Sequence, residues 1–386
     1  MTALNSTPVN QRAATGAKRR EVDVLVIGAG QAGLGTGYWL THRFAHSFLI
    51  VDGASELGQS WTDRWDSLRL FTPRGFSRLP GLPFPAGPGD YPSKSEVAAY
   101  LQSYAARFAL PVQLDTRVEV LAASGRGFVA STTQGQIRAR HVVVATGPFH
   151  GAYVPDAATG LGSNVGQLHS VDYRRPADID APDVLVVGGG NSAAQLACEL
   201  APTHRVTMAS PRRPWFLPQV IAGVGLYRWL RLSGTLAAKS DARVSRYIRG
   251  RGDPIIGREL ADRVNSGQIK LLPHRVTAGN GDTLTLQDGS RITTSAVLWC
   301  TGFRPDYGWV QLSAALDADG LPIHHRGASP VAGLHWMGLP WQTRLNSSLV
   351  DGVDRDARDL VARLHGVTAL TAGGECSRHA DPLPGG

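Results

Sequence analysis

Cysteine is scarce in this chain of 386 residues, which has three, at positions 198, 300 and 376. An odd number with no two close in sequence excludes a disulfide framework and a local C-x-x-C metal or redox site. Long apolar runs are also missing: none reaches the roughly 18 residues of a membrane span, and the N-terminus lacks the apolar core of a signal peptide. With an ordinary hydrophobic content of 42%, these absences predict a cytoplasmic, globular protein of two or three domains, with no metal site.

Positive charge is concentrated in two places within the net charge of +8. Residues 1–20 hold four basic side chains and no acid, and their polar composition predicts a disordered tail. Residues 205–260 hold eleven Lys or Arg against three acids. Such a segment can indicate nucleic acid. Because it lies beside a second nucleotide motif, cofactor phosphates or a solvated helical face are simpler explanations, and no nucleic-acid partner is predicted.

The most informative stretch is residues 22–33, an apolar run followed by G-x-G-x-x-G. The run predicts a buried parallel strand, and an apolar helical stretch follows it. Gly28 allows a tight turn, Gly30 lets the backbone approach a pyrophosphate, and Gly33 lets helix and strand pack closely. A second strand ends at Asp52, 19 residues after Gly33, where a carboxylate is expected to bind a ribose hydroxyl. In this context a plain glycine-rich turn is the weaker interpretation.

The same motif, an apolar run followed by a glycine-rich turn, occurs again at residues 183–193, where Gly188, Gly190 and Ala193 match the G-x-G-x-x-A variant. A helix is expected over 191–200 and a strand over 205–209. The chain therefore predicts two dinucleotide-binding folds.

The second fold differs from the first at the end of its second strand. No acid follows that strand; Ser210, Arg212 and Arg213 stand there instead. A carboxylate would repel a 2′-phosphate, whereas a hydroxyl and a guanidinium bind one through charge-assisted hydrogen bonds. The pattern predicts FAD in the first fold and NADPH in the second.

The fold class predicted is α/β, with two Rossmann-like domains on parallel sheets, the second inserted in the first. Alternating runs between 112 and 145 predict a small antiparallel meander, and Ser93 with Glu96 predicts a capping box that opens a helix to about Phe108. The apolar strand 296–302 is expected to run parallel to 142–147 in the first domain. The domain boundaries predicted are 1–20 for a basic tail, 21–165 and 291–366 for the FAD domain, 166–290 for the NADP domain with a helical insert at about 215–260, and 367–386 for a flexible tail.

The stretch 220–232 contains Tyr227 and Trp229 among aliphatic residues. It allows three interpretations: a membrane-surface segment, a substrate-channel lining or an interior helix. An interior helix is favoured, because the stretch is short and mixed in composition for an anchor.

Several of these motifs together resemble the class B flavin-dependent monooxygenases, the group of flavin-containing monooxygenases, plant YUCCA enzymes and Baeyer–Villiger enzymes, and especially its short bacterial YUCCA-like members. The resemblance covers about residues 22–365. One departure is that Ser163 and Val165 occupy the Phe and Gly places of the family signature, with Gly166 one residue late, whereas His169 and Tyr173 fit its second half. The residues that carry the resemblance are the three glycines from Gly28 to Gly33, Gly58 to Trp61, Tyr91 to Ser93, Ala145 to Gly147, His169 with Tyr173, Gly188 to Ser192, and Thr301 to Phe303.

The resemblance implies an NADPH- and FAD-dependent monooxygenase that inserts one oxygen atom from O₂ into a small organic substrate through a C4a-(hydro)peroxyflavin. It also implies a more apolar flavin face than in many relatives, because Phe71 stands where they carry a polar residue. A quinone or protein reductase and a non-catalytic flavin-binding regulator remain alternatives. No catalytic side chain is predicted, and His169 is interpreted as structural. The residues expected to bind the cofactors are Gly28, Gly30, Gly33, Asp52, Gly58, Gln59, Trp61, Ala145, Thr146, Gly147, Gly188, Gly190, Asn191, Ser192, Ser210, Arg212, Arg213, Thr301, Gly302 and Gln342.

Overall fold

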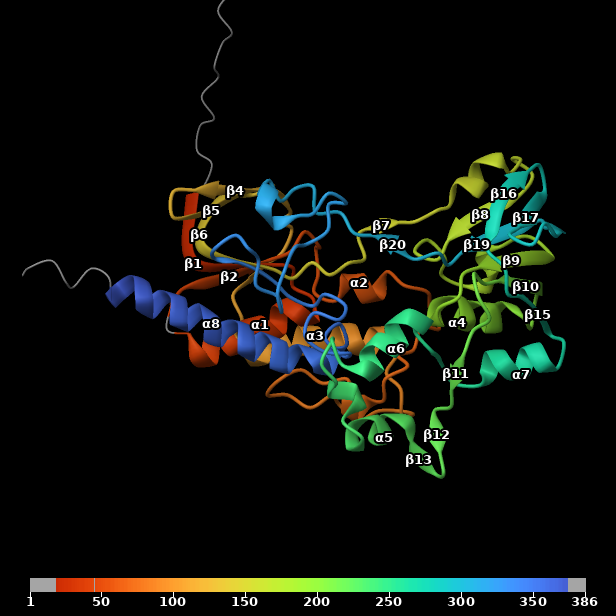
Figure 1. Ribbon diagram of the computed structural model, residues 1–386, viewed down its shortest axis with the longest axis horizontal. Coiled ribbons are helices and arrows are strands. Elements are labelled where there is room, and N and C mark those ends of the chain that lie inside the picture. The colour runs from red at the N-terminus through yellow and green to blue at the C-terminus, as the bar shows by residue number, and fades with distance from the viewer. Residues whose placement is uncertain (1–18, 45, 374–386) are drawn as a thin grey trace, which may run out of the picture.

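The computed structural model describes residues 19–44 and 46–373, which form two units, each on its own sheet (Figure 1). This architecture confirms the expected α/β class with two Rossmann-like folds. The tails expected at 1–20 and 367–386 lie for the most part outside the described residues.

The first unit is a seven-stranded sheet with strand order β3-β2-β1-β6-β5-β4, and β21 also pairs with β6. β6 is long enough to pair antiparallel with β5 over residues 135–139 and parallel with β21 over 142–144. β4, β5 and β6 confirm the expected meander, whereas residues 112–113 pair parallel with β2 and lie outside it. The strands are β1 (Arg19–Ile27), β2 (Phe48–Val51), β3 (Val112–Gln113), β4 (Val118–Ser124), β5 (Gly127–Thr132), β6 (Gly135–Val144) and β21 (Leu334–Trp336).

Three helices cover one face of this sheet: α1 (Gln31–Arg43), α3 (Lys94–Arg107) and α8 (Val353–Gly373) (Figure 1). The expected capping box opens α3, because Ser93 Oγ accepts from the N–H of Glu96 and the Glu96 carboxylate accepts from the N–H of Ser93. The opposite face packs on apolar residues of segments 307–316 and 331–339.

The second unit is a parallel five-stranded sheet with strand order β15-β10-β9-β19-β8. Helices α4 (Asn191–Leu200) and α7 (Glu259–Asn265) pack on one face, and a three-stranded antiparallel sheet packs on the other. The strands are β8 (Gly166–His169), β9 (Asp183–Val187), β10 (Arg205–Ala209), β15 (Ile269–Leu272), β19 (Ala296–Trp299) and, in the small sheet, β16 (Val276–Asn280), β17 (Thr283–Leu286) and β18 (Arg291–Thr293).

The expectation that residues 291–302 belong to the first unit is wrong for β18 and β19. β19 pairs with β9 and β8 in the second sheet. Both units contain a strand whose last four residues are buried and which is followed by Thr-Gly, and burial alone does not specify which sheet such a strand joins. The chain returns to the first unit after β19, through β20 (Phe303–Arg304), which pairs antiparallel with β7 (Gly151–Ala152) between the two sheets (Figure 1).

The described residues at both ends differ from the predicted boundaries of the tails. Arg19 and Arg20 begin β1, where they pair with Gln136 and Ile137 of β6. α8 continues to Gly373, past the predicted end at 366. No proline interrupts this helix, and its one interior glycine, at 366, costs only about 1 kcal/mol.

The insert at 215–260 is partly helical, as expected, but residues 220–232 do not form an interior helix. Residues 220–225 form a hairpin with exposed apolar side chains, and only 226–232 are helical. No helix in the described part of the chain is long and apolar enough to cross a membrane. The elements of the insert are β11 (Phe216–Leu217), β12 (Val220–Ile221), β13 (Val224–Gly225), α5 (Leu226–Leu232), α6 (Arg243–Arg251) and β14 (Ile255–Ile256). The remaining short helices are α2 (Gln59–Thr62), η1 (Arg74–Phe76), η2 (Asp156–Gly160), η3 (Pro176–Asp178), η4 (Thr235–Ala237), η5 (Ser313–Ala315) and η6 (Val350–Gly352).

Candidate functional site

A cavity of about 130 Å³ lies where the two units meet, and residues of both glycine-rich turns line it. Gln31 comes from the N-terminus of α1, and Asn191 and Ser192 come from that of α4. The two helices therefore direct their unpaired N–H groups and positive dipole ends to a common space, which suits two anionic cofactors. The other lining residues are mainly apolar: Trp61, Trp65, Leu68, Arg69, Leu70, Phe71, Thr72, Gln195, Ser348, Leu349 and Val350.

In the first turn, the structure explains two of the three glycines by protein contacts. Gly28 has φ +106°, and a Cβ there would lie 2.7 Å from the carbonyl oxygen of Ala145. A Cβ on Gly33 would lie 1.8 Å from the carbonyl oxygen of Gly28. Gly30 is different: its backbone is extended, at φ −72° and ψ −173°, and a Cβ there would meet no protein atom within 4 Å. Neither conformation nor packing requires glycine at position 30, so this space fits a bound pyrophosphate.

Asp52 follows β2 and contacts the same turn. Its Oδ2 accepts from the N–H of Ala29 at 2.6 Å, and its Oδ1 accepts from the N–H of Ala54 at 2.9 Å. Each carboxylate oxygen has a further lone pair, so the residue can still accept from ribose hydroxyls. Asp52 is thereby fixed beside the first glycine-rich turn, and its contact with a ribose hydroxyl stays a prediction.

The segment Gly58 to Trp61 lies next to this turn. Gly58 has φ +84°, and a Cβ there would lie 2.7 Å from the Cα of Ala98 in α3, so close packing requires glycine. Gln59 accepts from the N–H of Ser55 at 3.1 Å and therefore stabilises its own loop. Trp61 lines the cavity.

The second turn repeats the first. A Cβ on Gly188 would lie 2.3 Å from the carbonyl oxygen of Cys300, because β19 runs directly beside β9. Gly190 has an extended backbone and open space where its Cβ would be, like Gly30. The same argument makes Gly190 the candidate for a phosphate-facing position in the second unit.

The side chain of Asn191 has a structural contact that the sequence did not predict. Its Nδ2 donates to the carbonyl oxygen of Pro254, and its Oδ1 accepts from the N–H of Ile256, both at 3.0 Å. Asn191 thus joins α4 to the end of the insert. The neighbouring Ser192 is exposed and lines the cavity.

The three residues predicted to bind a 2′-phosphate differ in their surroundings. Ser210 is buried, and its Oγ donates to the carbonyl oxygen of Arg212 at 2.7 Å. Arg212 donates through Nη1 to the carbonyl oxygens of Gly250 and Arg251, at 3.2 and 2.9 Å, and so caps the C-terminus of α6. Arg213 is exposed at the same turn.

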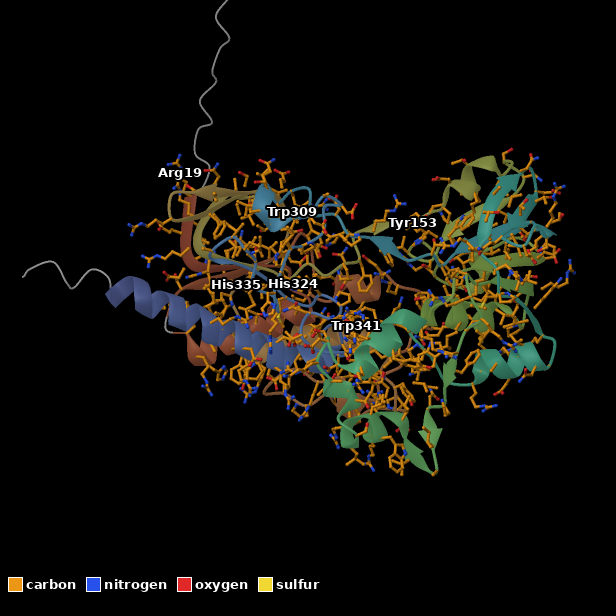
Figure 2. The ribbon with its side chains drawn as sticks, in the orientation of Figure 1. Arg19, Tyr153, Trp309, His324, His335 and Trp341 are labelled. Atoms are coloured by element: carbon orange, nitrogen blue, oxygen red, sulfur yellow. The ribbon has the colours of Figure 1, made fainter. Side chains whose placement is uncertain are left out.

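The two Thr-Gly segments lie where the chain crosses between the units. Tyr307 Oη donates to the carbonyl oxygen of Gly147, and Thr146 Oγ1 lies 3.2 Å from His150 Nε2. The hydroxyl of Thr301 donates to the carbonyl oxygen of Tyr153, the residue labelled between the two sheets in Figure 2. Ala145 to Gly147 and Thr301 to Gly302 therefore lie in the connection between the units, and the backbone of Ala145 also packs against Gly28.

His169 joins the two crossing segments. Its Nδ1 accepts from the N–H of Val171 at 3.2 Å, so the ring proton lies on Nε2, which donates to the carbonyl oxygen of Gly302 at 3.1 Å. Burial lowers the pKa of this histidine and favours its neutral form. The ring also makes a T-shaped contact with Phe303, whose face lies under the guanidinium of Arg64. These contacts support the structural role predicted for His169.

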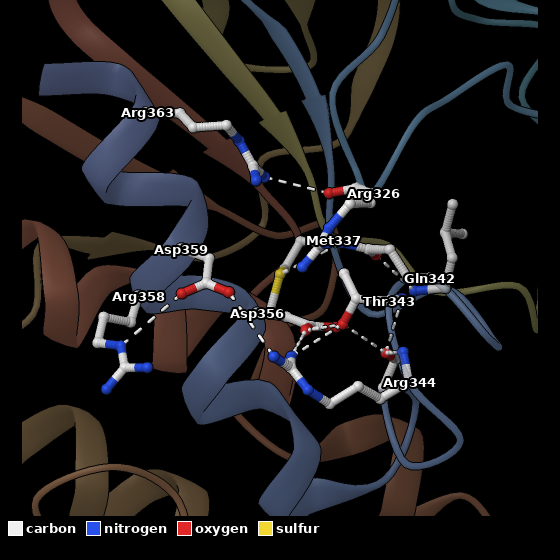
Figure 3. A network of polar contacts seen from close by, with 11 residues as sticks. Arg326, Met337, Gln342, Thr343, Arg344, Asp356, Arg358, Asp359 and Arg363 are labelled. Atoms are coloured by element: carbon white, nitrogen blue, oxygen red, sulfur yellow. Dashed lines mark hydrogen bonds and ion pairs between the residues drawn. The ribbon is translucent and has the colours of Figure 1, made fainter. Parts of the chain in front are cut away.

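Gln342 lies in the first unit, outside the set of residues that lines the cavity. It is 3% exposed, and it accepts from the N–H of Leu339 and donates to the sulfur of Met337 (Figure 3). The following residues, Thr343 and Arg344, bind the buried carboxylate of Asp356 in α8 (Figure 3). Gln342 therefore fixes the loop that leads to α8.

Sequence reasoning missed two parts of the cavity, Ser348 to Val350 and Leu68 to Leu70. The first part directly precedes α8, and its apolar residues fit the core pattern of that helix equally well. The second part lies in an irregular loop without periodicity. The interpretation of Phe71 as a residue near the cofactor agrees with its place in the cavity.

Asp351 lies beside this cavity, and burial raises its pKa from the ordinary 3.8 to about 6. Because this pKa is higher in the folded state, the folded protein favours the neutral carboxyl group of Asp351. Its contribution to the free energy of unfolding is fully present below about pH 4 and is lost as the pH rises through about 6. We expect Asp351→Asn to raise the free energy of unfolding by about 1–3 kcal/mol at about pH 8 and to change it little at about pH 4. Denaturant titration measures both values, with Asp241→Asn, at an exposed acid, as the control. An equal effect at both pH values would contradict the buried carboxylate.

No group of three His, Cys, Asp or Glu side chains that could hold a metal ion occurs among the described residues. The cysteines that the structure describes, Cys198 and Cys300, are free thiols. Burial raises the pKa of Cys198 to about 12 and also raises that of Cys300, so neither favours the reactive thiolate.

Two dinucleotide-type turns that share one cavity define the class of two-nucleotide oxidoreductases. Residues 25–222 match the family model described as pyridine nucleotide-disulphide oxidoreductase. The chain belongs to this family, as a member of its class B flavin monooxygenase-like group, and is a flavin-dependent oxidoreductase.

Three relatives define the place of the chain within the family. It is 42% identical to an uncharacterized CzcO-like oxidoreductase of Geobacillus kaustophilus, over 88% of this chain and 97% of the relative. It is 30% identical to the solved flavin-containing monooxygenase from Stenotrophomonas maltophilia, with a TM-score of 0.76, over 90% of this chain and 99% of that one. It is 28% identical to the probable indole-3-pyruvate monooxygenase YUCCA9 of Arabidopsis thaliana, over 77% of this chain and 79% of the relative.

Proposed function

We propose that this protein is an NADPH- and FAD-dependent monooxygenase that transfers one oxygen atom from O₂ to a small organic substrate. The observation that carries the proposal is the cavity shared by two glycine-rich turns and walled by Trp61, Phe71, Leu349 and other apolar side chains. FAD in the first unit would supply the oxygen chemistry, and NADPH in the second would supply the hydride. The similarity to the Stenotrophomonas flavin-containing monooxygenase supports the same conclusion.

The side chains of this protein would then bind, orient and exclude water. Gly30 and Asp52 would hold the first nucleotide, and Gly190 and Ser192 the second, each at the N-terminus of its helix. The apolar wall of the cavity would keep water from the reacting atoms, which prevents loss of reducing equivalents as H₂O₂. We propose residues 21–165 and 303–366 as the FAD domain, residues 166–302 as the NADP domain, and a cytoplasmic location.

The test is NADPH oxidation by the purified holoenzyme across a panel of amines, sulfides, ketones and indole-type acids, with H₂O₂ measured in parallel. A substrate should raise NADPH consumption and lower the H₂O₂ formed per NADPH, and its product should contain one ¹⁸O atom when the gas is ¹⁸O₂. Rapid anaerobic reduction of quinones, with no ¹⁸O in any product, would show that the protein is a reductase and not a monooxygenase. Absence of NADPH oxidation under all conditions would favour a flavin-binding regulator.

His169 provides a test of water exclusion. We expect His169→Ala to increase the H₂O₂ formed per NADPH by about two- to tenfold, because one hydrogen bond of about 0.5–1.5 kcal/mol between the crossing segments is lost. The rate of flavin reduction should change less than this ratio. His204→Ala is the matched control, because His204 Nε2 also donates to a backbone carbonyl oxygen, that of Ile179, but lies beyond the C-terminal end of α4. If wild type and His169→Ala form the same amount of H₂O₂ per NADPH, His169 has no influence on water exclusion.

A further inference from the structure

The insert of the second unit exposes four apolar side chains on adjoining elements. Val220 and Ile221 of β12 are 57% and 40% exposed, and Trp229 and Leu232 of α5 are 42% and 76% exposed. The indole Nε1 of Trp229 donates to the carbonyl oxygen of Ile221 at 3.1 Å, so hairpin and helix lie against each other. Leu232 follows Trp229 by three residues and therefore shares its helix face. These four residues are called the docking patch below.

The patch is held rigidly by the buried side of the same helix. Leu226 and Tyr227 are 4% and 5% exposed, and the ring of Tyr227 packs 5.6 Å from that of Phe76 in the first unit. The guanidinium of Arg231 lies 5.0 Å above the same Phe76 ring. Because α5 already has a packed apolar side, the exposed apolar side is not needed for its own folding.

Positive charge surrounds the patch. Residues 220–251 contain seven exposed basic side chains and one exposed acid, Asp241. Arg228 and Arg231 lie on α5 itself, and others follow on α6. In Figure 1 the β12–β13 hairpin and α5 form the lower edge of the molecule and project beyond both sheets.

We propose that the docking patch binds the surface of an anionic lipid bilayer. Exposed Trp and aliphatic tips that enter the interface, beside arginines that meet lipid phosphates, are the two components of interfacial binding. The projection of the hairpin and α5 lets this edge reach a flat surface without contact from either sheet. The described part of the chain would then dock on the bilayer without a helix that crosses it.

Two other occupants fit the observations less well. A second copy bound symmetrically through the patch would bring two sets of arginines, Arg228 and Arg231 among them, close together, which like-charge repulsion disfavours. Nucleic acid would use the arginines, but its phosphates give no reason for exposed Val220 and Leu232.

The first experiment is co-sedimentation of the FAD-loaded protein with phosphatidylcholine vesicles, with or without about one-third phosphatidylglycerol. Wild type should bind the anionic vesicles and lose at least about tenfold in affinity when the anionic lipid is omitted or the salt is raised. The double variant Val220→Ser/Leu232→Ser should lose about tenfold or more in affinity for the anionic vesicles, because it lacks the two apolar side chains that the bilayer would bury. Leu321→Ser/Ile323→Ser, at exposed apolar sites of the first unit, is the matched control and should bind like wild type.

Two further double variants test the second component, the attraction between arginines and lipid phosphates. Arg228→Gln/Arg243→Gln should weaken binding and flatten its salt dependence, whereas Arg126→Gln/Arg138→Gln, on the β4–β5–β6 meander, should not. The FAD content and NADPH oxidation of all variants verify that they are folded.

A spectroscopic readout distinguishes insertion of the patch from charge attraction alone. Brominated lipids should quench wild-type tryptophan emission, and Trp229→Phe should remove that quenching. The proposal is overturned if folded wild type does not bind anionic vesicles, or if the patch and control variants bind them equally. It is also overturned if light scattering shows that Val220→Ser/Leu232→Ser converts a dimer to a monomer without effect on vesicle binding, or if only DNA binding depends on these residues.

Discussion

Purified Gly30→Ala protein is expected to be folded and to contain less FAD than wild type. The glycine has an extended backbone that alanine adopts freely, and the added Cβ would meet no protein atom within 4 Å. A Cβ in that space would instead collide with the pyrophosphate of bound FAD. Overpacking of about 1–3 kcal/mol corresponds to a loss of roughly 5- to 150-fold in FAD affinity. Visible absorbance and a titration of the apoprotein with FAD measure the loss, and circular dichroism verifies the fold.

Gly190→Ala is the matched control, because it places the same methyl group in the equivalent turn of the second unit. This variant should retain its FAD and lose NADPH affinity by a similar factor. Full FAD content in Gly30→Ala, or loss of FAD in Gly190→Ala, would contradict the assignment of the two turns.

Arg213→Ala is expected to raise the KM for NADPH by about 10- to 100-fold and to leave the KM for NADH nearly unchanged. Loss of one charge-assisted hydrogen bond to a 2′-phosphate costs about 1.5–3 kcal/mol, and NADH lacks that phosphate. Steady-state kinetics with both cofactors measure the two values. The sequence singles out Ser210 and Arg212 at least as strongly, but the side chains of both donate to backbone carbonyl oxygens, whereas Arg213, exposed like Arg212, has no side-chain hydrogen bond to another described residue.

Arg212→Ala tests the same turn from its structural side. Because Arg212 caps the C-terminus of α6, its removal should lower the melting temperature and affect NADPH and NADH more equally than Arg213→Ala does. A selective loss of NADPH in Arg212→Ala, with no change in Arg213→Ala, would assign the phosphate contact to Arg212.

The two glycine-rich turns could be predicted from the sequence because their glycines stand at fixed spacings within one short stretch, even where the residues that require them are distant. Gly28, Gly33 and Gly188 are required by the approach of a neighbouring strand or turn, and such requirements leave glycine at fixed spacings. Asp52 follows its strand at the expected distance and contacts the turn through Ala29. The two-sheet architecture follows because the unit of strand, glycine-rich turn and helix occurs twice in the sequence.

The parts that could not be predicted depend on distant segments. The side chain of Arg212 donates to the C-terminal end of α6, 38 residues later in the sequence. β19 joins the second sheet by pairing with β8 and β9, which lie 110 or more residues earlier. The apolar residues at 220–232 fit either an interior helix or an exposed edge, because composition does not state which side the rest of the chain covers. Ser348 to Val350 line the cavity only because α8 packs beside α1.

The order of the strands in the first sheet has a consequence for biosynthesis. β6 ends at Val144, and β21, which pairs with its last three residues, begins at Leu334. The roughly 190 intervening residues emerge from a ribosome in about 10–40 s at typical elongation rates. Throughout that time the nascent first unit presents an open, apolar strand edge at Val142 to Val144, and α8 is still absent from its face. The second unit has all its strands by Trp299 and can complete its sheet before the first, although synthesis of the first began earlier.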